Sequence, residues 1–130
     1  MKCFDEQSFD VFDVEGLDAR MVEIRAKIQP IFSDIMTEVA KRLTAYTGEE
    51  SFVHIRRSRY APESTWSAIS DNKRGYKSQA HLQLGIWQDY VFMYLSIIDN
   101  PKPKQTYATY LASHHTFPED FIYSIDHTKP

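Results

Sequence analysis

The feature that most restricts the fold is a run of apolar residues spaced three and four apart in the N-terminal half of the chain. From Leu17 to Tyr46 these steps continue without a change of phase, which is the pattern of one buried helix face. Pro30 interrupts the run and removes a helical hydrogen bond. The sequence therefore predicts a kinked helix, or two abutting helices, that ends at Gly48. The members of the run are Leu17, Met21, Ile24, Ile28, Ile31, Ile35, Val39 and Leu43.

The apolar period changes to two after this helix, which is the pattern of β-strands rich in β-branched and aromatic residues. Between two of the predicted strands only Gln88 and Asp89 intervene, so we expect a tight hairpin in which Trp87 pairs with Tyr90. The predicted strands cover residues 52–55, 65–70, 78–87, 90–98 and 120–126.

The register of this hairpin sorts its side chains onto two faces. One face is entirely apolar and suited to packing on the helix: Ala80, Leu82, Leu84, Ile86, Val91, Met93, Leu95 and Ile97. The other mixes polar and aromatic side chains: His81, Gln83, Gly85, Trp87, Tyr90, Phe92, Tyr94 and Ser96.

A short second helix is predicted after a proline-marked loop, with Tyr107, Tyr110 and Leu111 pointing inward. The 130 residues suit one hydrophobic core. The prediction is a single α+β domain over residues 1–130. In it, a long kinked N-terminal helix packs on one face of a largely antiparallel sheet, and the second helix is short.

Composition excludes several classes of protein. The longest apolar run, residues 90–98, is shorter than the roughly 18 residues that a membrane span needs. The lone Cys3 cannot form an internal disulfide, and the acidic N-terminus does not resemble a secretory signal, so we expect a cytoplasmic protein. The net charge of −3 argues against nucleic acid as a partner.

Charge is nevertheless segregated along the chain. Residues 54–77 hold six cations and two acids, giving +4 and leaving −7 for the rest. Within this segment the loop sequence "DNKRGY" joins two predicted strands, and Gly75 there would permit a positive φ angle. The loop is either a solvated hairpin turn or a cationic loop that holds a phosphate or carboxylate.

A small anionic ligand held by this loop and by the mixed sheet face is the preferred functional interpretation. Cations interleaved with aromatic rings suit phosphorylated or planar ligands. This interpretation requires Arg57, Lys73, Arg74, His81 and Gln83 to converge on one concavity. The full candidate set is Arg56, Arg57, Trp66, Asn72, Lys73, Arg74, Tyr76, Lys77, His81, Gln83, Tyr94, Asp126 and His127.

Two other functions remain open. A protein-interaction or structural module would use exposed aromatics and a sheet edge, and would form a homodimer. An enzyme would use His81 or His127 as an acid or base beside the anion. No cofactor is indicated. No metal site is expected, because the histidines and Cys3 are scattered without ligand spacing.

Three segments carry a family resemblance: "FDVFDVEGLDARMVEIRAKIQP", "TWSAISDNKRGYKSQAHLQLGIW" and the terminal "DHTKP". The chain resembles the YktB-like bacterial proteins, domain of unknown function 1054, over nearly its whole length. The resemblance implies an α+β domain in a cytosolic bacterial protein and assigns no residue a role. The matching positions are Leu17, Arg20, Met21, Trp66, residues 72–77, His81, Gln83, Gly85, Asp126 and His127.

The chain also differs from the family that it resembles in two respects. The segment "HIRRSRYAPESTW" is shorter here than in relatives. Relatives continue beyond "DHTKP", so we expect that C-terminal elements are absent from this chain. A sheet shortened in this way would leave an edge or an apolar face uncovered, which favours a homodimer.

Overall fold

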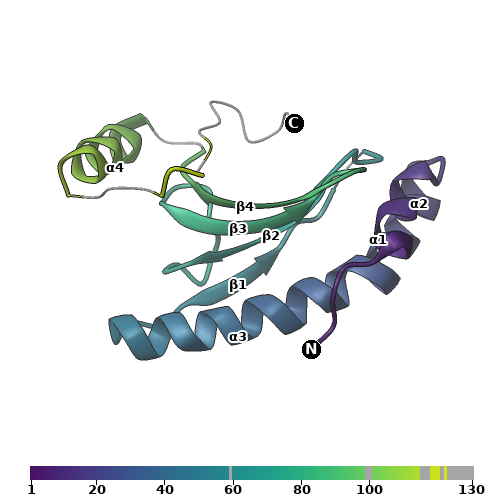
Figure 1. Ribbon diagram of the computed structural model, residues 1–130, viewed down its shortest axis with the longest axis horizontal. Helices are drawn as coiled ribbons and strands as arrows, with labels where there is room; N and C mark the ends of the chain where they lie inside the picture. Colours follow the sequence, from purple (N-terminus) through teal and green to yellow (C-terminus); the bar gives the residue numbers. More distant parts are fainter. Residues whose placement is uncertain (59, 99–100, 115–117, 121, 123–130) are drawn as a thin grey trace.

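The computed structural model describes residues 1–58, 60–98, 101–114, 118–120 and 122. Helices and strands are segregated along the chain, as expected for an α+β domain (Figure 1). In chain order the elements are α1 (Glu6–Asp10), the 3₁₀ turn η1 (Val11–Asp13), α2 (Leu17–Glu23), the π-helical turn η2 (Ile24–Ile28), α3 (Gln29–Thr47), β1 (Phe52–Ile55), β2 (Thr65–Ser70), β3 (His81–Ile86), β4 (Val91–Ser96) and α4 (Pro101–His114).

The long N-terminal helix is interrupted next to Pro30, which confirms the predicted kink. The turn η2 separates α2 from α3, and Pro30 lies in the first turn of α3. The first N–H groups of a helix have no partner within it, so the missing N–H of proline is tolerated there. Gly48 ends α3 with φ of 76°, and its N–H donates to the Thr44 carbonyl at 2.9 Å.

The four strands form one antiparallel sheet in the order β1-β2-β3-β4. The predicted hairpin is confirmed, since the Trp87 N–H donates to the Tyr90 carbonyl at 2.8 Å. β1 and β2 have the predicted bounds, and β3 and β4 are shorter than predicted. The fifth strand, predicted over residues 120–126, falls almost wholly outside the described residues. Asp120 and Ile122, which are described, are not in a strand.

The main core lies between the helices and one face of the sheet. Figure 1 shows α3 running along that face. Ile24, Ile28 and Phe32 are fully buried there, and they pack in one cluster with Leu84 and Ile86 of β3. Burying such side chains contributes about 1.5–3 kcal/mol each. Ile24 and Ile28 belong to the predicted apolar run, whereas Phe32 lies outside it and is buried where Ile35 of the run is only partly buried.

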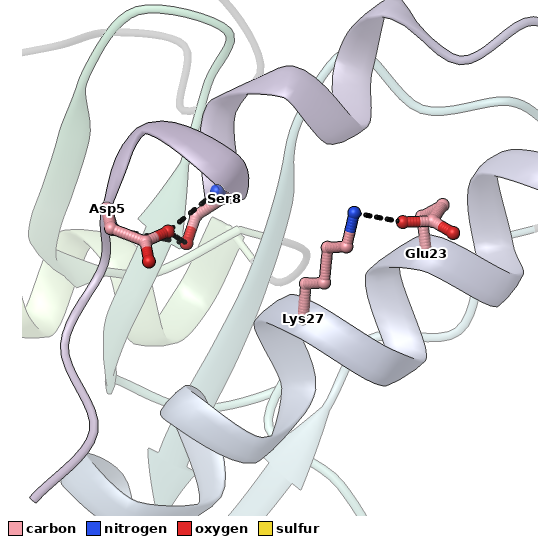
Figure 2. A network of polar contacts seen from close by, with 4 residues as sticks. All are labelled: Asp5, Ser8, Glu23 and Lys27. Atoms are coloured by element: carbon pink, nitrogen blue, oxygen red, sulfur yellow. Dashed lines mark hydrogen bonds and ion pairs between the residues drawn. The ribbon is translucent and has the colours of Figure 1, made fainter.

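The N-terminal turn is closed by side-chain hydrogen bonds. Asp5 accepts from the backbone N–H of Ser8 at 3.1 Å, while Ser8 Oγ accepts from the Asp5 N–H at 3.2 Å, which is a reciprocal cap. Figure 2 shows this cap near the ion pair of Lys27 with Glu23, whose atoms are 2.6 Å apart. The bond to Glu23 raises the pKa of Lys27.

Two expectations about buried faces are wrong. The apolar face of the hairpin is covered on β3 but not on β4, where Val91, Met93 and Leu95 are 40%, 81% and 52% exposed. The helix layer packs on β1, β2 and β3 and does not extend over β4. Tyr107 and Tyr110 of α4 are also exposed, where the sequence predicted that they point inward.

Candidate functional site

Tyr76 anchors the loop between β2 and β3 to the mixed face of the sheet. Its hydroxyl accepts a hydrogen bond from Trp66 Nε1 at 3.2 Å, and both residues are buried. Its ring packs edge-on against His81, with 4.9 Å between ring centroids, and lies 5.7 Å from the ring of His54. The loop of residues 71–80 therefore folds back over strands β1, β2 and β3.

Polar contacts within the loop fix its path. Asn72 Oδ1 accepts from the Arg74 N–H at 2.9 Å, a turn that Asn commonly forms. Ser70 Oγ lies 2.8 Å from the Gly75 carbonyl oxygen, which also accepts from Gln79 Nε2 at 2.9 Å. Gly75 does not use the positive φ that glycine permits, since only Gly16 and Gly48 have one among the described residues. These side-chain bonds shape the loop without that conformation.

His81 and Gln83 lie side by side on β3, as predicted. Nδ1 of His81 lies 2.9 Å from the Gln79 carbonyl oxygen, which can only accept, so Nδ1 carries the hydrogen. Nε2 then accepts from Gln83 Nε2 at 3.0 Å. Both side chains are 2% exposed. Burial lowers the pKa of His81, against the smaller opposite effect of the Gln79 and Tyr76 carbonyls.

Arg56 lies over the Trp66 indole. Its guanidinium carbon lies 3.8 Å from the ring centroid, and its Nη1 donates to the Ser64 carbonyl at 3.1 Å. The contact is a cation–π interaction, which holds Arg56 in place as part of the sheet's cover. Burial lowers the pKa of Arg56. The two basic segments thus approach each other through Arg56, Trp66 and Tyr76.

Phe92 closes the mixed face at the hairpin end. It is the cross-strand partner of Gly85, and a Cβ added to Gly85 would lie 2.1 Å from the Phe92 ring. The Phe92 ring also stacks on Tyr94, with centroids 4.8 Å apart. Glycine at this position lets the aromatic ring lie flat over the strand, and Tyr94 belongs to this packing.

An open cavity of about 630 Å³ lies between β1 and the loop. Residues 53–55 of β1 form one wall, and residues 72 and 74–79 form the other. Arg74 and Lys77 are exposed at this wall, and none of the lining residues is acidic. His54 and Tyr76 contribute rings beside these cations. The cavity therefore combines positive charge with aromatic rings.

The predicted site residues fall into four groups. Asn72, Arg74, Tyr76 and Lys77 line the cavity. Arg56, Trp66, His81, Gln83 and Tyr94 belong to the packed layer on the mixed face. Arg57 and Lys73 are exposed and outside the lining, and Asp126 and His127 lie outside the described residues. Of the five residues expected to converge on one concavity, Arg74 alone lines this cavity.

β1 contributes to the cavity, which the sequence did not predict. Val53, His54 and Ile55 line the cavity, and His54 Nε2 lies 3.0 Å from the Asn72 carbonyl oxygen and 3.1 Å from Ser70 Oγ. The sequence offered one indication of this contribution, namely that β1 directly precedes the basic segment. That strand becomes the edge of the sheet. Ser78 and Gln79 were missed because they were assigned to a strand.

Neither a metal site nor a histidine in an open cleft with a shifted pKa is found in the described part of the chain. That part holds no group of three potential metal-ligating side chains. His81, the histidine whose pKa is lowered, is packed beneath Tyr76. No helix within the described ranges is long and apolar enough to cross a membrane.

Comparison with known proteins assigns the chain to a group of bacterial sequences. A family model described as "Domain of unknown function (DUF1054)" matches residues 4–130. A UPF0637 protein of Enterococcus faecalis is 54% identical over 138 residues, a match that covers 100% of this chain and 68% of the relative. One of Lactococcus lactis subsp. cremoris is 50% identical, with 97% and 67% covered. One of Bacillus licheniformis is 38% identical, with 98% and 64% covered. The chain thus spans about two thirds of the length of these relatives.

Proposed function

The chain belongs to the DUF1054 family, and on that premise we propose that it is a binding module for a small anionic ligand held between β1 and the loop of residues 71–80. One observation carries the proposal. The cavity at this position is bordered by Arg74 and Lys77 and has no carboxylate in its lining. Its volume of about 630 Å³ is within the range of small-molecule sites.

The two cations would act differently on the ligand. The planar guanidinium of Arg74 can form two parallel hydrogen bonds with a carboxylate or phosphate, whereas Lys77 supplies a point charge. The rings of His54 and Tyr76 offer a surface for a planar group such as a nucleobase. This chemistry favours a phosphorylated or carboxylated metabolite, including nucleotides.

A panel of thermal shifts tests the proposal. A ligand that binds only the native state raises the melting temperature by mass action. Inorganic phosphate, nucleotides, sugar phosphates, coenzyme A and dicarboxylates would be compared on the wild type, Arg74→Ala and Lys73→Ala. Lys73 is the matched control, since it is an exposed cation of the same loop outside the cavity lining.

We expect at least one anion to stabilise the wild type and Lys73→Ala but not Arg74→Ala. The proposal fails if no anion raises the melting temperature of the wild type, or if the two variants respond alike.

We also place the protein in the cytoplasm, as part of the same proposal, because the chain has a single cysteine and Cys3 is exposed.

The exposed row on β4 favours homodimer formation as a second candidate function. Since the Trp87 N–H bonds to Tyr90, Val91, Met93 and Leu95 direct their backbone N–H and C=O groups to the outer edge. β4 contains neither proline nor a charged residue, the features that usually prevent edge pairing. Sedimentation velocity over a wide concentration range tests this candidate. The wild type should dimerise and Met93→Lys should not, and a monomeric wild type would reject it.

A further inference from the structure

The backbone of β1 presents hydrogen-bonding groups along the cavity that no other strand of the described residues uses. In the sheet that the described residues form, β1 is an edge strand paired only with β2. The Arg56 N–H donates to the Trp66 carbonyl at 3.1 Å. Backbone groups alternate in direction along a strand, so the N–H and C=O groups of His54 and Phe52 also point toward β2. The N–H and C=O groups of Val53 and Ile55 therefore point to the outer edge.

The cavity follows this edge. Neighbouring residues of a strand point to opposite faces of the sheet, yet the three consecutive residues 53–55 all border the cavity. A cavity confined to one face would meet only alternate side chains. The space thus runs beside the main chain of β1, with the loop residues 74–79 as its far wall.

We propose that the ligand of this cavity is an extended acidic peptide that adds a fifth strand to the sheet beside β1. The inference rests on the proposed anion site and names the class of its ligand. Main-chain hydrogen bonds to Val53 and Ile55 would supply affinity, as in other cases of strand addition. Acidic side chains on one face of the peptide would meet Arg74 and Lys77, which supply the charge complementarity.

The charges around the edge restrict where the acids of the peptide lie. The loop begins after Ser70, which pairs with Phe52, so its cations are near the start of β1. Glu49 and Glu50, which precede β1, and Asp71 of the loop are outside the cavity lining. Acidic side chains of the peptide are therefore favoured beside the loop wall. They are disfavoured toward Glu49, where like charges repel.

A peptide series tests strand addition without altering the protein. The probe is a capped hexapeptide with alternating glutamate and valine, titrated calorimetrically into the full chain. Two derivatives carry backbone N-methyl groups on alternate residues, one on the glutamates and one on the valines. Only one of these sets directs its N–H groups toward β1, so the other set is the matched control.

We expect one methylated set to weaken binding by about tenfold or more, which corresponds to losing about 1.4 kcal/mol, and the other to bind like the parent. A peptide with lysine in place of glutamate should not bind, and Arg74→Ala should weaken the parent. Equal binding of the two methylated sets, or no gain of the peptide over free glutarate, overturns strand addition.

The outcomes separate this inference from the proposed function. If phosphate or glutarate binds through Arg74 while the peptide gains nothing from its main chain, strand addition is rejected and the anion site stands. If small anions and peptides all fail to bind, both are rejected. Binding of the peptide that is insensitive to Arg74→Ala rejects recognition of the peptide at this cavity, and the response of phosphate or glutarate to Arg74→Ala then decides the anion site on its own.

Discussion

The indole Nε1 of Trp66 donates a hydrogen bond to the hydroxyl of Tyr76 at 3.2 Å, in the buried layer between the sheet and its longest loop. Trp66 belongs to β2 and Tyr76 to the loop of residues 71–80, so this bond ties the cationic loop to the sheet. The wall that carries Arg74 and Lys77 is thereby held beside β1.

Removal of the Tyr76 hydroxyl should loosen this wall. Tyr76→Phe keeps the ring contacts with His54 and His81 but loses the bond to Trp66, and we expect the free energy of unfolding to fall by about 1 kcal/mol. Urea unfolding followed by tryptophan fluorescence measures it. Tyr60→Phe is the control, since Tyr60 is 84% exposed, and an equal effect of the two variants would contradict the assignment.

The packing of Phe92 over Gly85 gives a second prediction. Gly85→Ala places a Cβ 2.1 Å from the ring, which must then move, so the free energy of unfolding should fall by about 1–3 kcal/mol. Gly75→Ala should be neutral or stabilising by up to about 1 kcal/mol, because its Cβ meets nothing within 4 Å and its φ is not positive. Thermal and urea denaturation of both variants measure these changes in the free energy of unfolding. A neutral Gly85→Ala would be inconsistent with the packing.

Arg56 and Arg57 are neighbours with opposite surroundings. Arg56 lies over Trp66 and donates to the Ser64 carbonyl, whereas Arg57 is exposed. Arg56→Lys loses the planar stack and should cost about 1 kcal/mol, while Arg57→Lys should leave the unfolding midpoint unchanged. Urea unfolding measures both variants, and an Arg56→Lys variant as stable as the wild type would contradict the stacking role of Arg56.

Stability should depend on pH through His81. Because burial lowers its pKa below the ordinary value of 6.5, the unfolded chain binds the proton more readily than the folded protein. The contribution of neutral His81 to the free energy of unfolding is therefore fully present above about pH 6.5, and it declines as the pH falls toward the folded-state pKa. His81→Gln should flatten this decline in urea melts between pH 5 and pH 7.5. His54→Gln should retain most of it, since the charge of His54 is only a minor cause.

Local periodicity was sufficient for much of the fold. The apolar run from Leu17 predicted the helix layer and its kink, and the pair Gln88 and Asp89 predicted the hairpin register. The predicted strands β3 and β4 were too long because alternation continues into residues 78–80 and 97–98, which are outside the ladder. Sequence pattern does not show where pairing stops.

The site was harder to predict because it depends on contacts between distant segments. Nothing in the loop sequence shows that Tyr76 will fold onto Trp66 and His81 and separate Arg74 from His81 and Gln83. His54 and the edge of β1 become part of the cavity only once the strand order is known. Exposed β4 could not be foreseen either, because the extent of helix cover is a tertiary property.

The most direct test of the anion site is a titration of ¹⁵N-labelled protein with the most stabilising anion of the thermal-shift panel, followed by amide and arginine side-chain NMR signals. The account predicts saturable shifts confined to residues 53–55, residues 72–79 and the Arg74 Nε signal, all absent in Arg74→Ala. Shifts centred on β4 or on α4, or shifts that persist in Arg74→Ala, would contradict it.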